Sequence, residues 1–241
     1  VAKLAVPASV GFFFNTMFNV VDTFFGGMVS TQAQAALSLS FPVFFIIIAL
    51  GSGLSSGATA IIANALGAGG SRDARVLSRQ TISLAFLAAV VLTAVGLIAS
   101  RPLFIFLGAS DAYLGDCLAY MYTIFAGTIF FLGAYALNAI LNALGDTRSY
   151  RNFLIAGFLA NVVLDPWFIF GGLGVPAMGI VGLAVSTVLI ELSGALYLAV
   201  KVRNRHARRP RFKGLLSPTR PHGRDHQPGT ARRHQHVHRG V

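Results

Sequence analysis

The sequence predicts an all-α membrane protein with six transmembrane helices, and three observations support this fold class. The chain of 241 residues is 55% hydrophobic and only 11% charged, whereas soluble domains carry roughly 25% charged residues. Its apolar residues gather in six long segments, and about 20 such residues are enough to cross a bilayer core. Up to position 200, Lys and Arg fall almost entirely between alternate segments.

The predicted spans cover residues 4–29, 36–66, 76–99, 113–144, 152–170 and 177–200. Glycine or proline marks the breaks between them, at Gly67–Gly70, Arg101–Pro102, Gly145–Thr147 and Gly171–Gly172. The second and fourth spans are longer than one crossing requires, so we expect them to tilt, bend or extend into water. Residues 1–200 therefore form one six-helix transmembrane domain.

The basic residues predict the orientation of these helices. With six spans, one side of the membrane receives nearly all of the Lys and Arg residues of the short loops: Lys3, Arg72, Arg75, Arg79, Arg148, Arg151, Lys201, Arg203 and Arg205. The other side receives only Arg101. Because cytoplasmic loops carry the excess of Lys and Arg, we expect a multi-pass protein of the inner (plasma) membrane with both termini in the cytoplasm.

Residues 201–241 differ sharply in composition from the rest. They hold twelve of the 19 Lys and Arg residues and all six His residues, so the net charge of +11 describes this segment. It lacks an apolar period and is predicted to be a disordered, basic cytoplasmic tail that contacts membrane lipid, or an out-of-frame sequence. Metal binding by its alternating histidines and nucleic-acid binding are weakly supported, because a disordered segment makes a poor metal cage and no aromatics are interleaved for stacking.

Three carboxylates lie inside the predicted spans, namely Asp22, Asp165 and Glu191. Each costs about 2.5–3.5 kcal/mol or more at the centre of a bilayer, so such residues normally face a cavity or a partner. Asn19 and Asp22 share a face of the first span, and Asn161 and Asp165 share a face of the fifth. The two aspartates lie roughly 11 Å and 9 Å from the outer ends of their spans, at similar depth.

This arrangement predicts a cation or proton site. Burial disfavours the charged form of a carboxylate, so such a group can take up a proton and change its hydrogen-bond partners. The alternative is that each carboxylate only joins neighbouring helices structurally, and for Glu191 we weigh the two roles equally. Asn138 and Thr187 are weak signals alone, because both types often form interhelical hydrogen bonds. No catalytic motif, Walker loop or paired cysteine is found, so we expect neither an enzyme nor a cofactor.

Several short motifs, in this order and spacing, resemble the multidrug and toxic compound extrusion (MATE) transporters between about residues 4 and 200. They are Asn19–Thr23, Ser40–Pro42, Gly57–Thr59, Leu66–Gly69, Asn138–Leu141, Gly145–Thr147 and Asn161–Pro166. The resemblance implies export of cationic, amphipathic drugs in exchange for H⁺ or Na⁺. It also implies a cation site in the N-terminal lobe, matched here by Asp22, Asp165, Asn161, Asn138 and Thr187, with Na⁺ as the one metal at the same site. Asn19 and Glu191 are accessory candidates because of their own positions in the spans.

Length is the main departure from the family pattern, which has two six-helix lobes. The sequence resembles the N-terminal lobe, so we expect it to act with a second lobe or as a homodimer. Two alternatives stay open. One is a truncated fragment that does not transport. The other is a flippase for lipid-linked substrates, whose cavity should carry cationic residues that are not seen inside these spans.

Overall fold

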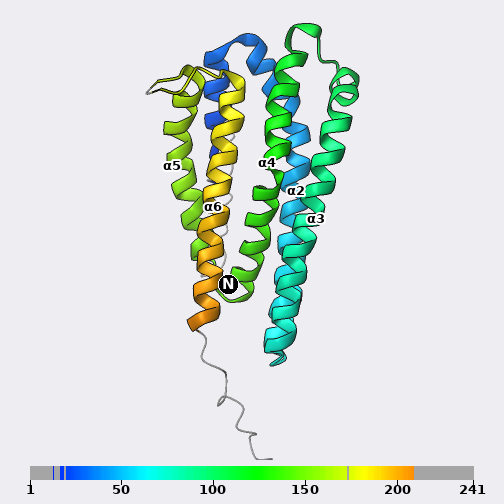
Figure 1. The fold of residues 1–241 in the computed structure, drawn as a ribbon, viewed down its shortest axis with the longest axis vertical. Helices are drawn as coiled ribbons and strands as arrows, with labels where there is room; N and C mark the ends of the chain where they lie inside the picture. The colour runs from blue at the N-terminus through cyan, green and yellow to red at the C-terminus, as the bar shows by residue number, and fades with distance from the viewer. Residues whose placement is uncertain (1–12, 14–16, 19, 173, 209–241) are drawn as a thin grey trace, which may run out of the picture.

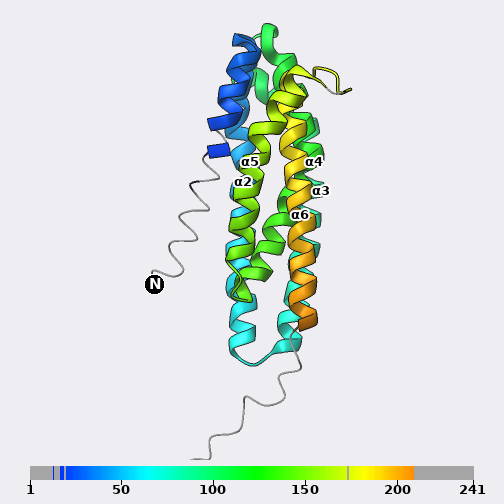
Figure 2. The same cartoon turned by 90° about the vertical axis from the view of Figure 1, so that its left-hand side faces the viewer.

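The computed structural model describes residues 13, 17–18, 20–172 and 174–208. Five long helices run back and forth along one axis (Figure 1): α2 (Thr31–Gly67), α3 (Ser71–Phe106), α4 (Asp111–Ala143), α5 (Arg148–Phe170) and α6 (Ile180–Arg208). A shorter apolar helix, Val20–Val29, precedes α2 and lies beside α5 near one end of the bundle (Figure 2). The described residues contain no strand, only an isolated bridge between Gly172 and Val175.

Each of the five long helices is long and apolar enough to span a membrane. Large apolar side chains on their outer faces stay exposed, with Phe86 57% and Ile98 80% accessible on α3. A water-facing helix would carry polar residues there, so these faces suit contact with lipid. The prediction of an all-helical membrane protein is confirmed.

Helix α4 lies at the centre and packs against α2, α3 and α6. Small residues allow the helices to approach closely, as is common in membrane bundles. At Gly127, for example, an added Cβ would lie 2.4 Å from a methyl group of Val188 on α6. Hydroxyl groups also join helices, since Thr93 Oγ1 on α3 donates to the Phe125 carbonyl on α4 at 2.7 Å.

Most observed helix ends differ by a few residues from the predicted ends, and three differences affect the predictions made above. Pro102 does not end the third helix, because a single missing backbone donor is tolerated and α3 continues to Phe106. Arg72, Arg75 and Arg79 lie on the first turns of α3, not in a loop. Helix α6 continues past residue 200 to Arg208, so the segment 201–208 is helical and the predicted start of the disordered tail is wrong.

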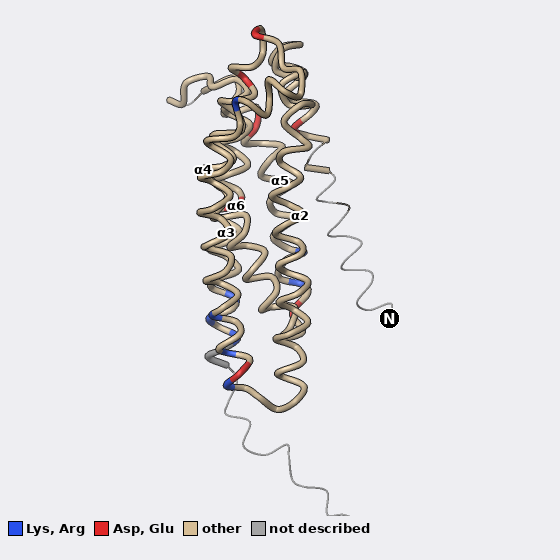
Figure 3. Tube along the Cα trace, turned by 90° about the vertical axis from the view of Figure 1, so that its right-hand side faces the viewer, with Lys and Arg blue, Asp and Glu red and all other residues tan. Residues whose placement is uncertain are grey.

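Other predictions fall outside the described residues, namely most of the span 4–29, Asn19 and the tail beyond residue 208. The described basic residues lie mostly toward the end of the bundle that holds the α2–α3 loop and the end of α6 (Figure 3). The charge asymmetry behind the predicted orientation is therefore present in the fold. The orientation itself stays a prediction.

Candidate functional site

Two aspartates from different helices meet around one asparagine. Asp22 comes from the helix Val20–Val29, and Asn161 and Asp165 lie one turn apart on α5. Asn161 Nδ2 donates to Asp22 Oδ1 at 3.1 Å and to Asp165 Oδ1 at 2.9 Å. We call these three residues the carboxyl–amide cluster. The sequence predicted that Asp22 and Asp165 lie at similar depth, and in the structure both contact Asn161.

The carboxyl–amide cluster is shielded from solvent. Asp22 is 4% exposed, and Asn161 and Asp165 are fully buried. Asn161 bridges the two carboxyl groups. Two buried carboxyl groups around one amide suit the uptake of a proton or a cation.

Ser186 on α6 is a member of this environment that sequence reasoning missed. Its hydroxyl contacts Asp165 Oδ1 and also lies 2.9 Å from the Leu183 carbonyl oxygen. With one hydrogen, the hydroxyl can donate to only one of these acceptors at a time. The sequence offered one signal, because Ser186 is a polar residue inside the sixth predicted span and directly precedes Thr187.

Several buried oxygens around the cluster have no hydrogen-bond partner among the described residues. They are Asp165 Oδ2, Asn161 Oδ1 and the Tyr120 hydroxyl. Tyr120 lies on α4, which packs against α6. Because unpaired buried acceptors are unfavourable, these atoms favour the arrival of a proton or an oxygen-coordinated cation.

The structure does not join the other predicted site residues to the cluster by hydrogen bonds. The Thr187 hydroxyl donates to the Leu183 carbonyl at 2.9 Å. Asn138 Nδ2 donates to Ser55 Oγ on α2 at 3.4 Å, and its Oδ1 lacks a partner among the described residues. Both residues are buried, and their predicted part in ion binding stays a prediction.

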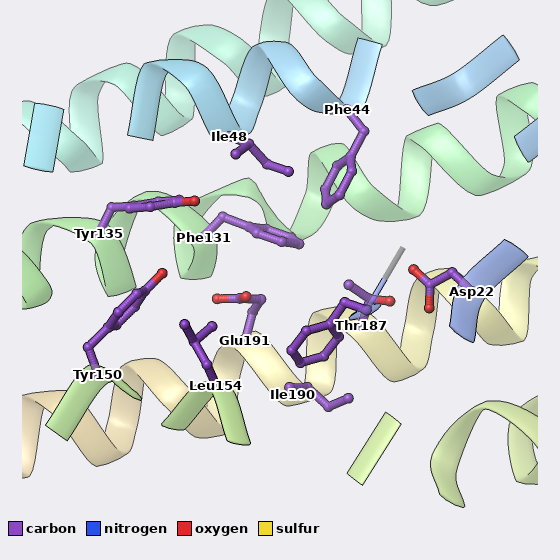
Figure 4. A pocket seen from close by; sticks show the side chains of 11 residues that line it. Asp22, Phe44, Ile48, Phe131, Tyr135, Tyr150, Leu154, Thr187, Ile190 and Glu191 are labelled. Atoms are coloured by element: carbon purple, nitrogen blue, oxygen red, sulfur yellow. The ribbon is translucent and has the colours of Figure 1, made fainter. Parts of the chain in front are cut away.

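A small cavity of about 40 Å³ extends from Asp22 into the bundle, which is enough space for a few water molecules. Figure 4 shows Asp22 toward one end, Tyr135 and Tyr150 toward the other, and Glu191 beside the tyrosines. Its walls are mainly aromatic and aliphatic, and Thr187 adds a hydroxyl group. The aromatic and aliphatic residues are Phe18, Phe44, Ile48, Phe131, Tyr135, Tyr150, Leu154 and Ile190. Two carboxylates and no Lys or Arg line it among the described residues.

A separate charged contact lies at the basic end of the bundle. Asp146, in the α4–α5 turn, accepts from the backbone and hydroxyl of Ser149 at 3.1 and 3.0 Å and from Arg205 at 2.9 Å. Burial alone would raise the pKa of Asp146, but the bonds from Ser149 and Arg205 outweigh it and hold that pKa below its usual value. This contact ties the end of α6 to the start of α5.

Comparison with known proteins decides the family. The MatE family model matches residues 7–167. The chain belongs to the MatE family. Its relatives include the probable multidrug resistance protein NorM of Thermotoga maritima, 33% identical over 90% of this chain and 46% of the relative. The FAD transporter of Shewanella oneidensis is 31% identical over 87% of this chain and 47% of that protein.

Solved MatE-family structures share the fold. A MATE crystal structure in a bent conformation matches with a TM-score of 0.77 at 30% identity, over 82% of this chain and 43% of that chain. An outward-facing multidrug resistance MATE transporter matches with a TM-score of 0.76 at the same identity. These relatives are transporters and not enzymes, and the chain spans about half the length of the curated relatives it matches.

Proposed function

We propose that the chain is the ion-coupling half of an efflux antiporter that exports cationic, amphipathic compounds in exchange for H⁺ or Na⁺. The carboxyl–amide cluster is the observation that carries the proposal. In it, two buried carboxyl groups from two different helices accept hydrogen bonds from the same amide.

Ion binding changes the hydrogen bonds that hold these helices together. A proton or Na⁺ on Asp22 or Asp165 alters what each carboxyl can accept, and so alters the link between the helix Val20–Val29 and α5. Pro166, inside α5 directly after Asp165, lacks a backbone N–H and leaves the Val162 carbonyl free, which eases bending at that point. Such a change can open or close the cavity beside Asp22 and so couple ion and substrate.

The charge of the cavity supports cationic substrates. Asp22 and Glu191 line it, and no Lys or Arg does among the described residues. An anionic ligand such as FAD, which the Shewanella relative transports according to its name, or a lipid-linked phosphate would require basic partners. The aromatic walls suit the apolar parts of an amphipathic cation.

Drug-resistance complementation in an efflux-deficient host tests the proposal. The chain should confer resistance to a cationic compound such as ethidium, and Asp22→Asn and Asp165→Asn should each abolish that resistance at equal expression. Asp111→Asn is the matched control, because Asp111 is an exposed residue in the first turn of α4. Resistance that survives in both cluster variants would contradict the assigned role, and a chain without resistance would not transport by itself.

The same proposal places the basic end of the bundle in the cytoplasm. A cysteine introduced in the α2–α3 turn at Gly69, in a Cys117→Ala background, should resist a membrane-impermeant maleimide in intact cells. A cysteine at Gly108, in the α3–α4 turn, should react with it. The opposite labelling pattern would invert the topology.

A further inference from the structure

Glu191 is an acidic residue that lines the cavity and is not part of the carboxyl–amide cluster. It lies on α6, four residues after Thr187, so both side chains face the same side of the helix. Figure 4 shows Glu191 beside Tyr135 and Tyr150, away from Asp22. Asp22 is instead joined to Asp165 through Asn161. The cavity therefore has two separate polar centres.

The Glu191 carboxylate makes no hydrogen bond or ion pair with any residue that the structure describes. It lies deep in the bundle yet is partly accessible, because it faces the cavity. Figure 4 shows it in the space beside Tyr135, Tyr150 and Phe131. A charged carboxylate without a partner is unfavourable in a bilayer interior, so a cation that enters the cavity would stabilise the ionised form of Glu191.

The surroundings of Glu191 indicate what that partner is. Phe131 packs edge-on against Phe44, with ring centroids 5.5 Å apart. Tyr135 is held against α2, where a Cβ at Gly51 would lie 2.3 Å from its ring. Small ions require several compact oxygen ligands, whereas a large organic cation is bound by a carboxylate combined with aromatic faces. The side chains that line the cavity supply the second combination, once the cavity has widened to admit such a cation.

We infer that Glu191, with Tyr135, Tyr150 and Phe131, forms a subsite that binds the positively charged group of an organic cation, separate from the carboxyl–amide cluster. The inference rests on the proposed function, because it requires cationic substrates to enter this cavity. It assigns substrate recognition to Glu191, and ion coupling to the aspartates.

Equilibrium binding to the purified full chain in detergent micelles tests the subsite. Tetraphenylphosphonium, a permanent cation that carries no titrating proton, is the probe, and the neutral triphenylphosphine oxide is the matched control ligand. Glu191→Gln should weaken tetraphenylphosphonium binding about tenfold or more, equivalent to about 1.4 kcal/mol. Glu191→Asp should retain most of the affinity, and binding of the neutral ligand should change less than about twofold in either variant.

A second variant tests the aromatic wall independently of the charge. Tyr135→Leu keeps the carboxylate and removes a ring face, and should weaken tetraphenylphosphonium binding about threefold. If the Glu191→Gln and Tyr135→Leu variants bind the cation as tightly as the wild-type chain, the subsite is overturned and the proposed function stays intact. Wild-type chain that does not bind the cation at all would contradict the proposed substrate class itself.

Discussion

Asn161 offers a sensitive test of how the two helices are joined. Asn161→Leu keeps a similar side-chain volume but removes the amide that donates to Asp22 at 3.1 Å and to Asp165 at 2.9 Å. Asp165 retains contact with Ser186, whereas Asp22 loses the one donor recorded for its carboxyl among the described residues. The link between the helix Val20–Val29 and α5 should weaken.

The expected size follows from the two bonds. Interhelical hydrogen bonds in membrane proteins average about 0.6 kcal/mol each, which gives a lower estimate of about 1 kcal/mol. Leaving a buried acceptor without its donor costs about 1–3 kcal/mol more. The free energy of unfolding should therefore fall by about 1–4 kcal/mol.

Reversible unfolding in mixed micelles with increasing sodium dodecyl sulfate measures this change. Trp167 is the only tryptophan of the chain and lies on α5, so its fluorescence reports on the same helix as Asn161. Val163→Leu is the control, because Val163 is 64% exposed on α5 and its variant should stay within about 0.5 kcal/mol of wild type. An Asn161→Leu variant equally close to wild type would refute the reasoning.

Two further variants test other contacts by the same unfolding measurement. Asp146→Asn should lose about 1–2 kcal/mol at neutral pH, because the ion pair with Arg205 is removed and the bonds from Ser149 are weakened. Because the pKa of Asp146 is lowered in the folded state, the extra stability of wild type over Asp146→Asn should be lost as pH falls below about 4. A difference in unfolding free energy that stays constant across pH would contradict this role of Asp146. Gly127→Ala should cost about 1–3 kcal/mol, because its Cβ would lie 2.4 Å from Val188. Gly133→Ala, which meets no atom within 4 Å, should be neutral, and equal effects at both glycines would contradict the packing described.

Much of the fold could be predicted because a bilayer imposes strong rules. Apolar length and the charge of the loops identified the long helices, and depth counting placed Asp22 opposite Asp165, where the structure joins them through Asn161. These predictions rest on periodicity and length, which are properties of one segment at a time.

Features that depend on contacts between segments were not predictable in this way. Ser186 reaches Asp165 because of how α6 rotates against α5, and Asn138 turns to Ser55 on α2. The end of α6 was misjudged because the Lys and Arg residues that look like a tail are compatible with helix. Its last turns are also tied to the α4–α5 turn by Arg205 and Asp146.

The central claim is that Asp22 and Asp165 exchange the coupling ion, and infrared difference spectroscopy of the purified chain tests it most directly. Spectra recorded with and without Na⁺, and at two pH values, should show a carboxylic acid C=O band that changes with the ion. A Glu191→Gln background removes the other carboxylate of the cavity. The band should disappear in Asp22→Asn and Asp165→Asn and persist in Asp111→Asn. A band unchanged in both cluster variants would contradict the central claim.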